Sequence, residues 1–114
     1  MASEYERAKQ TWAVWMGDEI MACGLAHKTD EPGVVNLRLF WRNAAVVVDA
    51  LRAITAGILA DPGTHRIEWR SWVDAHNVLG WANQAGGVRE SLLKKSAMRN
   101  GRLFDQYLFT WVKE

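Results

Sequence analysis

The chain has 114 residues, of which 49% are hydrophobic and 24% charged, and its formal net charge is +1. This length and composition predict a single domain over residues 1–114 that buries one core, and they exclude wholesale disorder. Charged residues interrupt every apolar stretch within about 18 residues, which argues against a membrane-spanning helix. The single cysteine, Cys23, excludes a disulfide framework and a zinc cluster, so no metal or cofactor is predicted. The acidic start lacks the regions of a signal peptide, and we therefore expect a cytoplasmic protein.

The amino-terminal segment predicts a helix from Ser3 to about His27. Ser3 and Glu6 match a capping box, in which each side chain satisfies a backbone N–H at the start of a helix. Apolar residues then recur at helical spacing, with Glu19 in their midst. This predicted stripe comprises Tyr5, Ala8, Trp12, Trp15, Met16, Ile20, Cys23 and Ala26.

A long central helix is predicted over residues 36–60, between a Pro-Gly turn signal at 32–33 and another at 62–63. Its apolar residues recur every three or four positions and fill one broad face, opposite a row of charged residues. The Val-Val-Val run at 46–48 favours a strand locally, but the helical period continues on both sides of it. We therefore expect this helix to be the most buried element of the domain.

Three further helices complete the predicted architecture. Residues 66–85 place His76 on a tryptophan-lined face and carry a second apolar ridge, residues 88–98 form a short helix of poor amphipathy, and residues 103–112 carry apolar pairs every four positions. Gly86-Gly87 and Asn100-Gly101 separate these segments. The sequence predicts an all-α fold, a bundle of about five helices around the central one.

Basic residues are concentrated near the carboxyl end, where five fall within fourteen residues that hold one acid, Glu90. On a helix, Lys95, Arg99 and Arg102 would share one face and could follow a phosphate backbone without reading bases. A solvated charged face is the alternative. The predicted nucleic-acid or anionic-partner residues are Arg89, Lys94, Lys95, Arg99 and Arg102.

Seven tryptophans are a large number for this length, and tryptophan is enriched both in cores and at protein interfaces. Trp69, Trp81 and Trp111 are the candidates for a protein interface, because two of the predicted helices carry them on apolar ridges. A protein partner or a nucleoprotein complex is therefore expected, with nucleic acid as the second candidate partner.

Glu19 and His76 are the two polar residues that the helical pattern places among apolar neighbours. If their helices faced each other, they could act as an acid–base pair. The alternative is structural: a carboxylate bonded at the rim of the core and a histidine bonded to a backbone carbonyl or to Asn83. Neither residue has a metal-binding partner at helical spacing.

Three functions follow from these patterns. The first is a small non-catalytic helical interaction module, a subunit or modulator of a nucleoprotein assembly of the bacteriophage or bacterial-defence type, which binds through exposed tryptophans and the basic helix. The second is a DNA-binding regulator with a helix-turn-helix over residues 72–95, although Gly86-Gly87 would interrupt its recognition helix. The third is a small enzyme that uses Glu19 and His76.

Overall fold

The predicted all-α bundle is wrong: the computed structural model, which describes residues 8–114, is built on a six-stranded sheet with two α-helices. In chain order the elements are β1 (Ala8–Met16), β2 (Glu19–Lys28), β3 (Val34–Trp41), the 3-10 turn η1 (Ala44–Val46), α2 (Val47–Leu59), β4 (Arg66–Trp72), α3 (His76–Gln84), β5 (Val88–Arg99) and β6 (Arg102–Val112).

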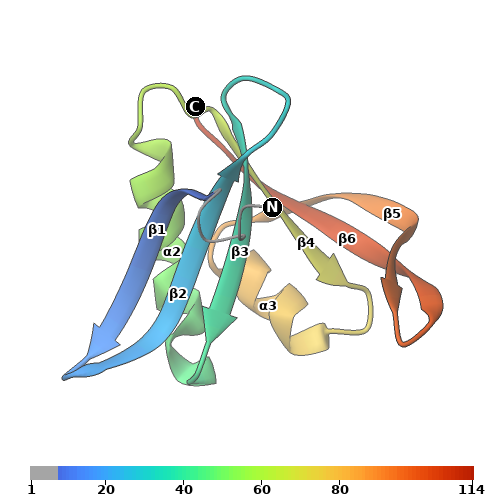
Figure 1. Ribbon diagram of the computed structural model, residues 1–114, viewed down its shortest axis with the longest axis horizontal. Helices are drawn as coiled ribbons and strands as arrows, with labels where there is room; N and C mark the ends of the chain where they lie inside the picture. Colours follow the sequence, from blue (N-terminus) through green and yellow to red (C-terminus); the bar gives the residue numbers. More distant parts are fainter. Residues whose placement is uncertain (1–7) are drawn as a thin grey trace.

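The strands lie in the order β1-β2-β3-β4-β6-β5 (Figure 1). All neighbours are antiparallel except β3 and β4, which run parallel because α2 carries the chain back between them. The hairpin β5–β6 is closed by Asn100 and Gly101, with φ angles of 53° and 75°. Two consecutive residues with positive φ are typical of the type I′ turn, whose twist matches that of the strands.

Both helices cover the same face of the sheet. Alternate strand residues, such as Leu37 and Leu39 on β3 and Ile67 and Trp69 on β4, point to that face and form one core with residues of α2 and α3. On α2, Leu51 is fully buried. The helix approaches β2 closely at Gly24, where an added Cβ would lie 3.0 Å from the side chain of Ile54 and 3.6 Å from that of Leu37.

The second helix, α3, packs on β6. The Trp111 indole Nε1 donates a hydrogen bond of 3.1 Å to the Ala85 carbonyl at the end of α3. The ring of Trp111 is tilted against that of Trp69, with 6.2 Å between centroids. The two helices are joined where the Arg52 guanidinium donates to the Gln84 carbonyl at 2.9 Å.

The structure corrects all five predicted helices, two of them in part. The capping box at Ser3 and Glu6 lies outside the described residues, and the rest of the first predicted helix is the hairpin β1–β2. The central prediction over 36–60 is correct only for α2, because 36–41 belong to β3. Residues 66–72 form β4, so only α3 remains of the third prediction. The segments 88–98 and 103–112 are the hairpin β5–β6.

The helical pattern misled because both faces of several strands carry apolar residues. Leu39, Phe40 and Trp41 are consecutive, and only Leu39 is buried, while Phe40 is 48% exposed and Trp41 39% exposed. Such runs contain spacings of three and four as well as of two, so periodicity alone does not separate strand from helix. Within residues 8–114, no helix has the length and apolar character needed to cross a membrane.

Candidate functional site

The candidate site is the gap that opens between the two parallel strands. β3 and β4 pair only over residues 34–36 and 66–68, whereas β4 pairs with β6 along its whole length. The Arg42 N–H donates to the Met21 carbonyl on β2 at 2.8 Å, so the backbone groups of Leu39 and Trp41, which alternate with it, point away from β2. The last paired residue of β3 is Asn36. These backbone groups therefore face the gap.

The same reasoning applies to β4. The Val73 N–H donates to the Asp105 carbonyl and the Lys113 N–H to the His65 carbonyl, which fixes the odd-numbered residues of β4 as those bonded to β6. Arg70 and Trp72 consequently present their N–H and C=O groups to the gap. Two strand edges with free backbone groups thus face each other inside the sheet.

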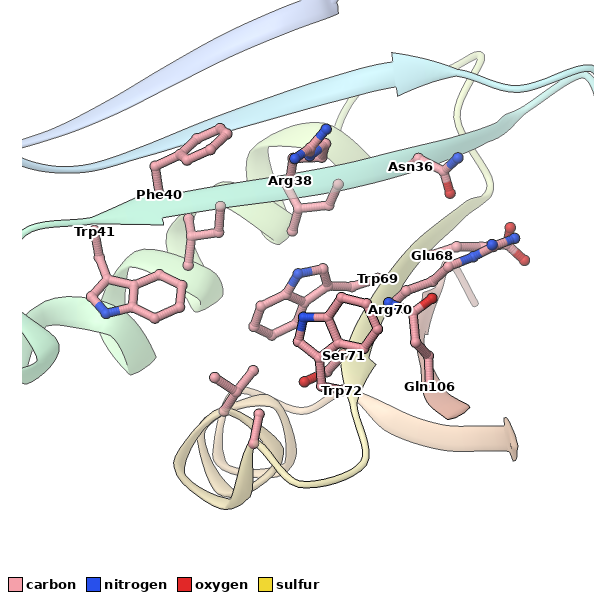
Figure 2. Close-up of a pocket in the computed structure, with 14 residues that line it drawn as sticks. Asn36, Arg38, Phe40, Trp41, Glu68, Trp69, Arg70, Ser71, Trp72 and Gln106 are labelled. Carbon is pink, nitrogen blue, oxygen red and sulfur yellow. The ribbon is translucent and has the colours of Figure 1, made fainter. Parts of the chain in front are cut away.

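A pocket of about 530 Å³ occupies this gap. Figure 2 shows Trp41 on one side of β3 and Arg38 and Phe40 on the other, so the pocket is bounded by side chains from both faces of the sheet. Its lining residues come from β3, β4, the start of α3 and β6: Asn36, Leu37, Arg38, Leu39, Phe40, Trp41, Glu68, Trp69, Arg70, Ser71, Trp72, Ala75, Val78 and Gln106.

Tryptophans form the wall on the helical face. Trp41 meets Trp81 of α3 edge to face, with 5.5 Å between ring centroids and 87° between planes. A second hollow of about 440 Å³ continues past this pair along the start of α3 and shares Trp41, Ala75 and Val78 with the first. The two hollows therefore adjoin each other and form one groove.

A chain of ion pairs lies where the gap begins, on the face opposite the helices. Arg66 Nε donates to Glu68 Oε2 at 3.1 Å, and its two terminal nitrogens donate to the two oxygens of Glu90 at 2.9 and 2.6 Å. Thr110 Oγ1 donates to Glu90 Oε2 at 2.9 Å. These bonds from Arg66, and then from Thr110, hold the pKa of Glu90 below its ordinary value, and Glu90 raises the pKa of Arg66.

Another ion pair fixes the far end of the gap. The Arg99 guanidinium binds both oxygens of Asp74, at 3.2 and 2.7 Å, and lowers the pKa of that carboxyl. The same guanidinium lies 4.7 Å from the ring centroid of Trp72 and 4.2 Å from that of Phe104. The tip of the hairpin β5–β6 is thereby attached to the loop between β4 and α3, beside the pocket.

The connection from β3 to α2 lies at this same end of the gap, because β3 and β4 run parallel. Asn43 Oδ1 accepts the Ala45 N–H at 2.9 Å, and the Asn43 carbonyl accepts the Val46 N–H at 3.3 Å. Two donors of this turn are therefore already used. The exposed Arg42 and the positive end of the α2 dipole remain to meet an anion at this point. Among residues 8–114, no three side chains are grouped to hold a metal ion.

The two predicted acid–base residues lie on separate elements. Glu19 is exposed in the hairpin β1–β2, whereas His76 is exposed at the start of α3 and lines the second hollow. Of the three tryptophans predicted for a protein interface, Trp69 and Trp111 are each 7% exposed and lie in the core, and Trp81 is partly buried and packs against it.

The predicted basic helix is the hairpin β5–β6, so its cations do not share a helical face. Arg99 binds Asp74, the Arg89 guanidinium lies 4.7 Å from the centroid of the Tyr107 ring, and Lys94 and Lys95 are exposed beside a bulge. Arg102 stands at the turn, 5.8 Å from the centroid of the Phe104 ring. The predicted helix-turn-helix is wrong as well, because residues 72–95 contain one helix between two strands.

Apart from Trp69, the residues that line the gap are not among the predicted site residues, although a local signal for them exists. From Arg66 to Arg70 polar and apolar residues alternate, with Ile67 and Trp69 buried. Strict alternation is typical of a strand with one covered face. It would have placed Glu68 and Arg70 on the open face, but it could not have shown that β3 separates from β4 there.

No protein-family model matches the chain, and no curated protein matches it either. Solved structures do. A GNAT-family acetyltransferase of Bacillus anthracis has a TM-score of 0.77 and 16% identity over 90% of this chain and 65% of its own. A spermidine N-acetyltransferase chimera of Vibrio cholerae SpeG and hSSAT has a TM-score of 0.82 and 11% identity over 96% and 69%. MccE, a microcin self-immunity acetyltransferase solved with acetyl-CoA and AMP, has a TM-score of 0.72 and 17% identity over 83% and 56%.

At these identities the likeness shows the fold, which is that of GNAT acetyltransferases. The chain spans less than two thirds of the length of the Bacillus anthracis protein and of MccE. The expected helical interaction module is therefore overturned, since the chain is not a helical module and the proteins that share its fold are acetyltransferases. The fold gives no support to the expected nucleic-acid binding either.

Proposed function

We propose that the chain binds an acyl-coenzyme A thioester in the gap between β3 and β4 and transfers the acyl group to an amine. The observation that carries this proposal is the pair of free strand edges, at Leu39 and Trp41 on one side and Arg70 and Trp72 on the other. An extended arm with amide groups can bond to such edges as an added strand would. MccE, of the same fold, is described with acetyl-CoA bound.

The residues present fit the amide-bearing arm of coenzyme A better than its diphosphate. The arm meets free N–H and C=O groups and a wall of tryptophans. The diphosphate would meet Arg42 and the α2 dipole, while Asn43 already takes two donors of that turn. Binding should therefore depend more on the arm than on the phosphates.

The thioester supplies an acyl group. The amine attacks its carbonyl carbon, and the thiolate of coenzyme A leaves. Backbone N–H groups of β3 that face the gap can donate to the acyl oxygen as negative charge develops on it. Glu68, a carboxylate in the pocket lining, accepts the proton that the amine nitrogen loses on forming the new C–N bond. The C–S bond breaks, the thiolate takes up a proton from solvent, and Glu68 releases its proton to solvent, which completes the exchange. The tryptophans restrict water at the thioester.

Binding is tested by titrating the protein with acetyl-CoA in a calorimeter, and transfer by following thiol release with spermidine and with a lysine-containing peptide as acceptors. We expect saturable binding and amine-dependent thiol release. Glu68→Gln should retain binding and lose about 100-fold in kcat, the typical contribution of a general base. Absence of acetyl-CoA binding would overturn the whole proposal, and binding without release would overturn the transfer step.

The tryptophan wall gives a matched pair of variants. Trp41→Ala should weaken acetyl-CoA binding about tenfold, because it removes one face of the groove and the contact with Trp81. Trp15→Ala removes an indole that is 59% exposed on the hairpin β1–β2, far along the sheet from the gap, and should leave binding unchanged. Equal loss in both variants would argue against the gap as the binding site.

A further inference from the structure

The ion-pair chain contains an asymmetry at Glu68. Only Oε2 of this carboxylate is bonded, by Arg66 Nε at 3.1 Å and by an Arg66 terminal nitrogen at 3.0 Å. Within the part of the chain that the structure describes, Oε1 carries no hydrogen bond. Glu68 is 24% exposed and lines the pocket. One oxygen is thus anchored and the other is open to a ligand in the gap.

The reason for this asymmetry is Glu90. The outer edge of the Arg66 guanidinium, formed by its two terminal nitrogens, binds both oxygens of Glu90. Each edge of a guanidinium, the outer one and the inner one formed by Nε and a terminal nitrogen, can bind both oxygens of a carboxylate. With its outer edge held by Glu90, Arg66 offers Glu68 its inner edge, and in this arrangement both nitrogens of that edge meet Oε2.

Glu90 is held in place by features of its own strand. The register of β5 against β6 shifts between Arg89 and Ser91, so Glu90 is the extra residue of a β-bulge. A bulge turns a side chain out of the regular alternation, and such bulges are frequent next to active sites. Thr110, which lies opposite Glu68 on β6, then bonds to Glu90 Oε2. Strands β4, β5 and β6 all contribute to the arrangement.

We propose that Glu90 is a positioning residue for acyl transfer, which occupies the outer edge of Arg66 so that one oxygen of Glu68 stays free to accept the proton of the amine. This inference rests on the proposed transferase function. The other charged and titratable groups that face Glu68 are Arg70 on the same strand, Arg38 on β3 and His27 on β2, which pairs with Asn36 beside Glu68.

Removing Glu90 has a consequence that a lost surface ion pair would not have. In Glu90→Gln, Arg66 is free to turn its outer edge onto both oxygens of Glu68. Both oxygens of Glu68 are then bonded to Arg66, and neither is open to the amine. We therefore expect kcat to fall about tenfold, the pH–rate profile to change, and acetyl-CoA binding to remain unchanged.

The experiment compares Glu90→Gln, Glu90→Asp and Asp49→Asn with the wild type for acetyl-CoA binding, kcat and pH profile with spermidine and the lysine-containing peptide. Glu90→Asp should recover part of the rate, because it restores a carboxylate near Arg66. Asp49→Asn removes an exposed ion pair with Arg52 on α2, 3.8 Å long, and should change neither rate nor profile. A crystal structure of Glu90→Gln should show Arg66 bonded to both oxygens of Glu68.

The outcomes separate the two claims. If the wild-type protein transfers the acetyl group and Glu90→Gln has the same rate and pH profile as the wild type, the role proposed for Glu90 is wrong. The transferase function would still stand. An Arg66 side chain that stays on one oxygen of Glu68 in the variant would also overturn the role of Glu90. Wild-type protein that neither binds acetyl-CoA nor transfers acetyl groups would overturn the proposed function, and this inference with it.

Discussion

The two neighbours of β4 differ in how far they follow it. On one side β6 pairs with it from Arg66 to Trp72, and on the other β3 separates after Glu68. The paired side is tied further by the Trp111–Ala85 hydrogen bond and forms part of the core, while the separated side leaves backbone groups without partners. Unmet backbone groups inside a sheet are costly unless water or a ligand meets them, so the open side is where a ligand gains most.

The tight packing of the paired side can be broken by a single methyl group. A Cβ at Gly87 would lie 2.7 Å from the Trp111 ring and 3.0 Å from the Ala82 carbonyl, and the ring is held by its bond to Ala85. Gly87→Ala should therefore lower the free energy of unfolding by about 1–3 kcal/mol. Thermal or urea denaturation measures this loss.

Gly80 provides the matched control on α3. A Cβ there meets nothing within 4 Å, and the residue is helical and exposed. Gly80→Ala should stabilise the protein by up to about 1 kcal/mol through helix propensity. If Gly87→Ala and Gly80→Ala changed the free energy of unfolding in the same direction, the packing described for Gly87 would be contradicted.

A smaller effect is expected at the ion pair that fixes the far end of the open side. The hydrogen bond from Arg99 holds the pKa of Asp74 below its ordinary value, so the pair stabilises the folded state above the unfolded pKa of about 3.9. This contribution is lost as the pH falls through the lowered pKa. The melting temperature of the wild type should exceed that of Asp74→Asn at pH 6, and the difference should close by about pH 2. A difference that persists at acid pH would show that the pair is not its source.

The sequence allowed part of this architecture to be predicted. Helix α2 and the breaks at Asp61-Pro62-Gly63, Gly86-Gly87 and Asn100-Gly101 are signalled by local chemistry, and they are present. The sequence predicts helices where the structure has strands, because apolar residues on both faces of β1, β3 and β6 produce helical spacings as well as alternation. The Val-Val-Val run at 46–48, which favours a strand locally, forms the end of η1 and the first two residues of α2 instead.

The site could not be predicted in the same way. Its existence depends on the insertion of β6 between β4 and β5 and on the separation of β3 from β4, which are contacts between residues far apart in the chain. Glu68 and Glu90 are separated by 22 positions, and only the bulge in β5 brings Glu90 to the guanidinium that contacts Glu68. Glu90 was noticed in the sequence only as the single acid of a basic segment.

Amide hydrogen exchange with and without acetyl-CoA tests the central claim most directly. The N–H groups of Leu39, Trp41, Arg70 and Trp72 face the gap, so their exchange should slow when acetyl-CoA binds. At a saturating concentration of acetyl-CoA we expect their exchange to slow at least tenfold. The N–H groups of Ile67 and Trp69 already bond to β6 and should be unaffected. Protection confined to other parts of the sheet, or the same change on both sides of β4, would contradict a thioester site between β3 and β4.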